Sequence, residues 1–276
     1  MDRHIDRKII LSIYRFVDSG VVLITILLCK IIYNFKERNF RCAKVMVIIM
    51  GQKNIVFLGD SITMGYGLPD PRKRFSTLFC EKIGYAENNY GITGTLIAKA
   101  GPSRANGSSF LDRYPAMTDN GNLIVVFGGV NDYFWSDEPI TGNLQDDRYF
   151  SCAVRHLCSG LKEKYPGRPI LFLLPYRQRG IGNFAGGADG MEHSFHNTDT
   201  KNYVGSTMEE YVLVLEQICR ETGIFTLDLF RNFGIDIAHI DEDFKTYTLD
   251  GCHPSENGHL RIAEILFEFC RKNRLI

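Results

Sequence analysis

The amino-acid sequence predicts an α/β protein in which a parallel sheet is covered by helices on both faces. Four short apolar runs have the length and composition of buried strands, and glycine, proline or polar residues follow each of them closely. Between and after these runs lie segments whose apolar residues recur at helical spacing. This alternation is typical of parallel sheets, whose strands are joined by long crossover connections. The predicted strands are 55–58, 123–127, 170–174 and 225–229, and the predicted helices are 75–83, 153–165, 208–219 and a terminal helix after residue 256.

The composition is that of an ordinary globular protein without net charge. Of the 276 residues, 45% are hydrophobic and 23% are charged, and 32 basic residues balance 32 acidic ones. A chain without net charge has no global field that would attract nucleic acid, so we expect no nucleic-acid partner. Residues 50–276 are expected to form one domain. The sequence carries no pattern that indicates an oligomeric state.

The eight cysteines are scattered along the chain. They form no Cys-x-x-Cys pair, and no histidine and cysteine cluster at the spacing of a zinc site. We therefore expect reduced thiols, which favour a cytoplasmic location. No metal and no organic cofactor is predicted.

Residues 1–49 differ from the rest of the chain. They carry nine Lys or Arg and four Asp or Glu, and residues 21–29 are an uninterrupted apolar run. This run is shorter than the roughly 20 residues of a membrane span, and no small-x-small cleavage site marks a signal peptide. Three interpretations stay open: sequence upstream of the natural start, a helix that contacts a membrane and makes the protein membrane-associated, or a helix packed on the domain. The first is favoured because Met50 leads directly into the first predicted strand.

A serine lies just beyond that first strand. Gly59 and Asp60 end the strand, and Ser61 follows them. In open α/β sheets, ligands bind outside the carboxyl ends of the strands, so the hydroxyl of Ser61 is expected to lie where a substrate binds. Taken alone, a serine at such a position is more often a helix N-cap than a nucleophile.

Three further segments place chemically useful groups at the ends of predicted elements. Gly91 and Gly94 indicate either a tight turn or a close approach of the backbone. Asn131 follows the strand at 123–127, and its amide lies at the carboxyl end of that strand. Asp250 and His253 lie three residues apart in a loop that enters the terminal helix. They form either a helix cap or a pair in which the carboxylate holds one imidazole tautomer, as a serine nucleophile requires.

Together and in this order, the four segments resemble the conserved blocks of the SGNH/GDSL family of serine hydrolases. The resemblance extends over residues 53–272 and implies a three-layer α/β/α sandwich with a flavodoxin-like, five-stranded parallel sheet. The fifth strand is then expected near residues 85–88. The matching blocks are Gly59-Asp60-Ser61-Ile62-Thr63, Asn89-Tyr90-Gly91-Ile92-Thr93-Gly94-Thr95, Gly129-Val130-Asn131-Asp132 and Asp250-Gly251-Cys252-His253-Pro254.

The resemblance also implies a role for each matching residue. Ser61 would be the nucleophile, His253 the general base that takes its proton, and Asp250 the carboxylate that orients His253. The oxyanion hole would consist of the backbone N–H groups of Ser61 and Gly94 and the side-chain amide of Asn131. Neutral donors suit this task because they stabilise the developing negative charge without perturbing the histidine.

The family hydrolyses esters of lipids, acetylated sugars and small acyl compounds, and some thioesters, so the resemblance leaves the substrate open. A short acyl or acetyl ester of a small molecule or carbohydrate is favoured. The alternatives are a lysophospholipase or thioesterase-type acylhydrolase and a catalytically silent binding domain.

Local sequence adds few indications of the substrate. Tyr133, Phe134 and Trp135 follow the asparagine block and either line the substrate site or are buried packing residues, which is more frequent. Arg177 either meets an anionic substrate group or is solvated. It lies near the start of the long segment 176–206, which is either a cover over the active site or a surface insertion.

Overall fold

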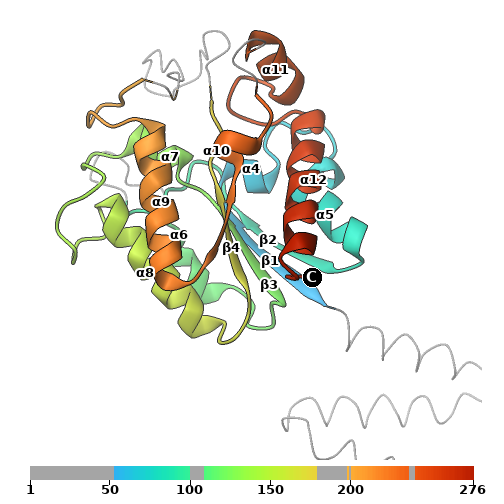
Figure 1. The fold of residues 1–276 in the computed structure, drawn as a ribbon, viewed down its shortest axis with the longest axis horizontal. Helices are drawn as coiled ribbons and strands as arrows, with labels where there is room; N and C mark the ends of the chain where they lie inside the picture. Colours follow the sequence, from blue (N-terminus) through green and yellow to red (C-terminus); the bar gives the residue numbers. More distant parts are fainter. Residues whose placement is uncertain (1–52, 100–108, 179–197, 199, 236–239) are drawn as a thin grey trace, which may run out of the picture. The chain divides into compact units, whose positions relative to one another are not determined.

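A five-stranded parallel sheet forms the centre of the structure (Figure 1). The computed structural model describes residues 53–99, 109–178, 198, 200–235 and 240–276, so the segment 1–49 lies outside the described residues. The strand order is β2-β1-β3-β4-β5, and every neighbouring pair is parallel. The strands are β1 (Asn54–Gly59), β2 (Ala86–Gly91), β3 (Leu123–Phe127), β4 (Ile170–Leu174) and β5 (Phe225–Asp228).

The strand order confirms the predicted flavodoxin-like sheet. The four strands predicted from apolar runs are present, with ends that differ by at most one residue. The chain passes from β1 to β2 on one side and then crosses to β3 on the other side of β1, which creates a topological switch point between β1 and β3. Ligands bind at such points in open α/β sheets.

The fifth strand, β2, extends further than predicted. The sequence suggests residues 85–88, whereas β2 spans Ala86–Gly91 and therefore includes the first three residues of the Asn89–Thr95 block. Every residue of this edge strand is only partly buried, and most of them are polar. An edge strand of this kind has no apolar run, so periodicity does not reveal it.

Helices cover both faces of the sheet (Figure 1). Helices α5 and α12 pack together on one face, and α6, α8 and α9 lie on the other. The bounds are α5 (Phe75–Ile83), α6 (Phe110–Arg113), α8 (Phe150–Lys164), α9 (Met208–Thr222) and α12 (Glu256–Lys272). Shorter elements are α4 (Ser61–Met64), α7 (Val130–Trp135), α10 (Leu229–Asn232), α11 (Ile240–Tyr247) and the 3₁₀ turns Pro71–Lys73 and Tyr114–Ala116.

The four predicted helices are present, and local signals explain where they end. Helix α9 begins with a capping box in which Thr207 and Glu210 bond each other's backbone N–H groups, and it ends at Gly223 with φ of 69°. Ser255 caps α12 by accepting a hydrogen bond from Gly258 N–H. Helices α4, α6, α7 and α10 were not predicted, because four to six residues are too few for a helical period.

The core consists of the central strands and the apolar stripes of the helices. All residues of β1, β3 and β4 are buried, as expected for parallel strands covered on both faces. Phe57 of β1 makes edge-to-face contacts with Phe75 and Phe79 of α5, with ring centroids 5.8 and 6.5 Å apart. These contacts hold α5 against the sheet at β1.

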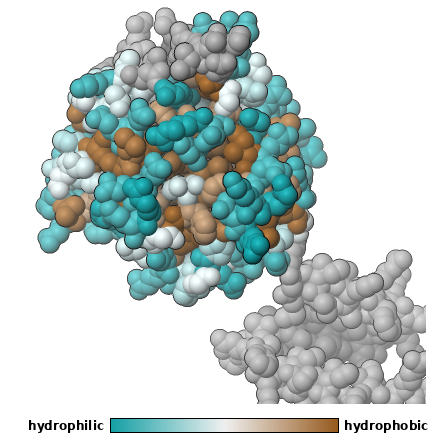
Figure 2. Space-filling model, in the orientation of Figure 1, coloured by the Kyte–Doolittle hydropathy of each residue, from teal (hydrophilic) through white to brown (hydrophobic). Residues whose placement is uncertain are grey.

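The surface of the described domain is mixed in polarity. On the face drawn in Figure 2, hydrophobic residues appear in patches separated by hydrophilic side chains. Among the helices that the structure describes, none is both long and apolar enough to cross a membrane. The six described cysteines are all buried, with no disulfide among them.

Candidate active site

Ser61 is the first residue of α4, which begins immediately after the central strand β1. Asp60 caps this short helix, because its Oδ1 accepts a hydrogen bond of 2.9 Å from Ile62 N–H. Gly65 ends the helix with φ of 84°, a conformation that favours glycine. The turn therefore holds Ser61 at the switch point, with its backbone N–H among the first N–H groups of a helix, which have no partner within the helix.

The structure brings together Ser61, near the start of the domain's sequence, and Asp250 and His253, near its end. Nε2 of His253 lies 3.1 Å from Oγ of Ser61, and Nδ1 of His253 lies 2.6 Å from Oδ2 of Asp250. Ser61 is 5% exposed and His253 is 8% exposed, so the pair is shielded but reachable. The three side chains thus form one continuous hydrogen-bonded chain, which can move a proton away from the serine hydroxyl.

Asp250 also organises the loop that carries the histidine. Its Oδ1 accepts hydrogen bonds from the backbone N–H groups of Cys252 (2.9 Å) and His253 (2.7 Å). Burial by itself would raise the pKa of Asp250, but the bond to His253, its charge and the two backbone donors outweigh burial and lower the pKa. The fully buried hydroxyl of Tyr176 donates to the carbonyl oxygen of Cys252 and fixes the same loop from the end of β4.

Asn131 lies on α7, at the carboxyl end of β3 and beside Ser61's strand. Its Nδ2 donates to the carbonyl oxygen of Thr95 at 3.1 Å and lies 3.4 Å from Oδ2 of Asp60. Gly94 precedes Thr95 and has φ of 72°. The amide of Asn131 therefore connects the serine turn with the segment that contains Gly94, and the three predicted oxyanion donors come from elements that meet here.

The close approach of the backbone occurs at Gly91 and not at Gly94. A Cβ at Gly91 would lie 2.3 Å from the backbone nitrogen of Met64, whereas a Cβ at Gly94 would meet nothing within 4 Å. The positive φ of Gly94 accounts for glycine at that position. Gly91 allows α4, and with it Ser61, to pack against the end of β2.

The side chain of Asp132 binds the backbone of the segment that follows Gly94. Its two carboxylate oxygens accept hydrogen bonds from the backbone N–H groups of Ile97 (2.9 Å) and Ala98 (2.8 Å). Complete burial raises the pKa of Asp132 to about 7, although both backbone donors lower it. Burial likewise raises the pKa of Asp60 to about 6. Each of these carboxyl groups holds a loop of the site, as polar groups in a dry interior require partners.

Arg113 is a supporting residue that the sequence does not reveal. Its guanidinium donates to the carbonyl oxygens of Tyr90 (2.7 Å) and Gly59 (3.0 Å) and to Oγ1 of Thr95 (2.9 Å). Burial lowers its pKa to about 10, while the charge of Asp60 opposes this shift. One side chain thereby connects the carboxyl ends of β1 and β2 to the segment beside Asn131.

Exposed apolar side chains border the serine and histidine. The ring of Tyr66 lies 4.6 Å from the imidazole of His253, and Tyr66 is 40% exposed. Met64 on α4, Ile92 after β2 and Leu249 beside the histidine loop are also exposed. No local pattern singles out these four residues, because they come from three segments, at 64–66, 92 and 249, that only the fold brings together.

The predicted substrate residues differ in their surroundings. Tyr133 is 1% exposed and Phe134 is 7% exposed, and both belong to the hydrophobic core. The hydroxyl of Tyr133 donates to the carbonyl oxygen of Thr200. Trp135 is partly buried and packs against the core. Arg177 lies over the ring of Phe230, 4.3 Å from its centroid. The buried rings of Tyr133 and Phe134 leave little surface for a ligand.

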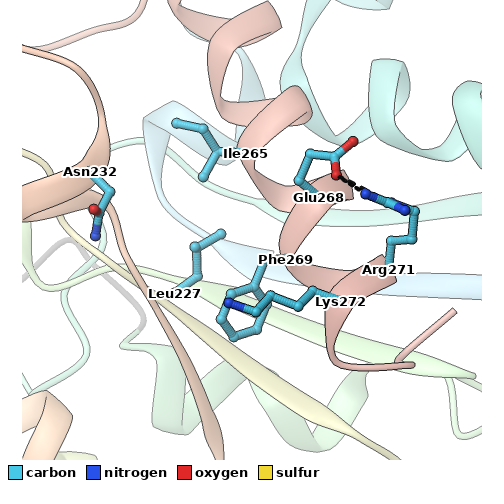
Figure 3. Close-up of a pocket in the computed structure, with 7 residues that line it drawn as sticks. All are labelled: Leu227, Asn232, Ile265, Glu268, Phe269, Arg271 and Lys272. Atoms are coloured by element: carbon cyan, nitrogen blue, oxygen red, sulfur yellow. Dashed lines mark hydrogen bonds and ion pairs between the residues drawn. The ribbon is translucent and has the colours of Figure 1, made fainter.

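Two other features lie outside these segments. Asp147, Cys152 and His156 place one possible metal-ligand atom each within 4.8 Å of one another. The sequence pattern does not reveal this group, because Asp147 supplies one of its three atoms. A pocket of about 500 Å³ lies between β5, α10 and α12 (Figure 3), and the ion pair of Glu268 and Arg271 lies at its edge. Its lining contains none of the predicted site residues: Leu227, Asn232, Ile265, Glu268, Phe269, Arg271 and Lys272.

Comparison with solved structures supports the observed fold. A protein from Lactobacillus plantarum is 29% identical, with a TM-score of 0.67 over 80% of this chain and 97% of that one. A protein described as a possible lipase from Chitinophaga pinensis is 19% identical, with a TM-score of 0.60 over 81% and 99% of the two chains. A carbohydrate acetylesterase family member from Sinorhizobium meliloti is 16% identical, with a TM-score of 0.55 over 80% and 98%.

The comparison with protein families identifies the chain more directly. No curated protein matches it. The model of the GDSL-like lipase/acylhydrolase family matches residues 57–261, which include all four blocks found in the sequence. This match extends over well more than half of the 276 residues. The chain therefore belongs to the GDSL-like lipase/acylhydrolase family.

Proposed function

We propose that this protein is a serine esterase that hydrolyses a carboxylic ester through an acyl-enzyme intermediate on Ser61. The observation that carries the proposal is the hydrogen-bonded chain from Ser61 through His253 to Asp250, with distances of 3.1 and 2.6 Å. His253 takes the serine proton as Oγ attacks the carbonyl carbon, and then gives that proton to the departing alcohol. A water molecule, activated by His253 in the same way, then attacks the acyl-enzyme and releases the acid and free Ser61.

The oxyanion of each tetrahedral intermediate is bound by the backbone N–H groups of Ser61 and Gly94 and by the amide of Asn131. Asn131 Nδ2 makes one good bond to Thr95 and a longer contact of 3.4 Å to Asp60. The oxyanion replaces the longer contact, because a hydrogen bond of 3.4 Å is weak and little is lost when Nδ2 gives it up. The bond to Thr95 keeps the amide in place before substrate arrives, which is the preorganisation that such a site needs.

The proposed substrate is a short acyl ester, with acetyl groups on a small molecule or carbohydrate as the first choice. A carbohydrate acetylesterase family member shares the fold, which supports this substrate class. The nucleophile lies at the carboxyl end of β1, and two of the three aromatic rings that follow Asn131, those of Tyr133 and Phe134, are buried. Those rings therefore take no part in the proposed recognition of the acyl group.

A longer-chain acylhydrolase, of the lysophospholipase or thioesterase type, is the second candidate. It is favoured by the exposed apolar side chains of Met64, Tyr66, Ile92 and Leu249, which are 37–50% exposed beside the serine and histidine. An acyl chain that covers these side chains would gain roughly 25 cal/mol for each Å² of apolar surface removed from water.

A fluorophosphonate probe tests the nucleophile. The wild-type protein should be labelled at one serine, and Ser61→Ala should not be labelled. Ser159→Ala, which changes an exposed serine of α8, is the matched control and should be labelled like the wild type. A folded wild-type protein that is not labelled would instead indicate a catalytically silent binding domain.

A hydrolysis panel tests the substrate. It compares p-nitrophenyl esters of rising chain length, acetylated sugars and a lysophospholipid, with Ser61→Ala as the blank. Highest kcat/KM for acetyl esters, extended to sugar acetates, supports the carbohydrate esterase. A kcat/KM that rises with chain length, and falls again when Tyr66 and Leu249 are both replaced by Ser, supports the longer-chain acylhydrolase.

A further inference from the structure

A second cluster of reactive side chains lies at the start of α8, separate from the serine site. Cys152 and His156 are four residues apart on this helix and therefore lie on the same face. Asp147 precedes the helix and turns its carboxylate toward both of them. Thiol, imidazole and carboxylate are the three ligand types that zinc uses in proteins.

The distances within the cluster are close to those of a tetrahedral site. Cys152 Sγ lies 3.6 Å from Oδ1 of Asp147, and His156 Nδ1 lies 2.5 Å from the same oxygen. With zinc bonds of about 2.3 Å to sulfur and 2.0 Å to nitrogen and oxygen, tetrahedral angles place sulfur and oxygen about 3.5 Å apart, and nitrogen and oxygen about 3.3 Å apart. The imidazole nitrogen therefore has to move about 0.8 Å away from Oδ1, and the side chain of His156 is 51% exposed.

The surroundings hold the other two ligands in place. Oδ2 of Asp147 lies 3.5 Å from the ammonium group of Lys99, which leaves Oδ1 for the cluster. Cys152 is buried, and its thiol donates to the carbonyl oxygen of Leu144 at 3.0 Å, a bond that the thiol gives up when it loses its proton to bind a metal. A charged partner such as Lys99, which orients a ligand from outside the site, is a regular feature of metal sites.

We propose that Asp147, Cys152 and His156 bind one zinc ion, with a water molecule as the fourth ligand. Binding removes the thiol proton of Cys152, which passes to solvent, and shifts the proton of the neutral imidazole from Nδ1 to Nε2. The negative charges of the thiolate and the carboxylate then balance the two positive charges of the ion. This site is independent of the proposed ester hydrolysis.

A bound ion would stabilise the segment beside the serine site. The carbonyl oxygen of Asp147 accepts a hydrogen bond of 2.9 Å from Lys99 N–H. The two residues before Lys99 are those whose N–H groups bind the buried Asp132. Zinc would therefore connect the start of α8 to the segment that follows Gly94, and its expected role is to stabilise this connection.

Cobalt titration of the metal-free, full-length protein tests the proposal, because tetrahedral cobalt absorbs visible light and a cobalt–thiolate bond adds a near-ultraviolet band. We expect one equivalent of cobalt to give both bands and zinc to displace it. Cys152→Ser should abolish the thiolate band, and Asp147→Asn or His156→Gln should raise the dissociation constant at least about 10-fold. The matched control is Asp146→Asn, which removes the neighbouring carboxylate that pairs with Arg148 and should bind cobalt like the wild type.

A thermal melt gives a second, independent readout. Zinc should raise the Tm of the wild type and of Asp146→Asn but not that of His156→Gln, whose exposed side chain can change without loss of the fold. The absence of the cobalt bands in the wild type would overturn the proposal. A thiolate band that persists in Cys152→Ser would also overturn it, since another cysteine would then be the ligand.

Discussion

Replacement of Asp250 by asparagine should remove most of the activity while the loop around it stays folded. The asparagine has one oxygen, and two backbone N–H groups, of Cys252 and His253, already require an acceptor at the position of Oδ1. The amide must therefore place its NH₂ group toward Nδ1 of His253, 2.6 Å away in the native structure. A donor at this position stabilises the tautomer that carries its proton on Nε2.

That tautomer cannot accept a proton from Ser61. Its Nε2–H points toward Oγ of the serine, 3.1 Å away, where the reaction needs a lone pair. In the reactive tautomer, the Nδ1–H group of His253 would face the NH₂ group of the asparagine, so that two donors would meet. In serine hydrolases with a comparable triad this exchange lowers kcat by about 10⁴, and we expect a loss of about 10³ to 10⁴, or about 4 to 5.5 kcal/mol of transition-state stabilisation. KM should change little, because Asp250 does not touch the substrate in the proposed mechanism.

The assay is steady-state hydrolysis of the best ester from the panel by the wild type, Asp250→Asn, His253→Ala and the double variant. If Asp250 acts through His253, adding Asp250→Asn to His253→Ala should cause almost no further loss. A loss below 10-fold in the single variant would refute the reasoning. An equal loss with and without His253 would refute it too, since Asp250 would then act by another route. Circular dichroism shows whether the variants are folded.

Three further predictions address the supporting structure. Asn131→Ala should lower kcat by about 10²- to 10³-fold with little change in KM, measured on the same ester, and an unchanged kcat would exclude the amide from the oxyanion hole. Gly91→Ala should lower both activity and Tm, because its Cβ would lie 2.3 Å from Met64 N, and chemical denaturation should show a loss of about 1 to 3 kcal/mol. His259 accepts a bond from Phe75 N–H, and burial lowers its pKa to about 3. The unfolded chain therefore binds a proton below pH 6.5 that the folded chain does not. Between pH 6.5 and 4.5 the wild type should lose about 2 kcal/mol of stability relative to His259→Asn, which keeps an acceptor, and parallel pH profiles of the two proteins would contradict this.

The parts of the fold that the sequence reveals are those that depend on local periodicity. Strands β1, β3 and β4 are buried on both faces, so their residues are almost all apolar and their bounds are readable. The helices α5, α8, α9 and α12 show an apolar stripe because each buries one face. Strand β2 is polar and half-buried at the edge of the sheet, and only the family resemblance indicates its place.

The sequence by itself determined which chemical groups stand at the ends of these elements: a serine after β1, an asparagine after β3, and an aspartate and a histidine before α12. Only the tertiary structure decided which of them meet. Ser61 and His253 are 192 residues apart, and their contact depends on the strand order and on the packing of α12 against α5. The same is true of Tyr66 beside His253 and of Asp147 with Cys152 and His156. Local spacing sets the direction in which a side chain leaves its own helix or strand, whereas the distance between two side chains depends on how every crossover between them packs.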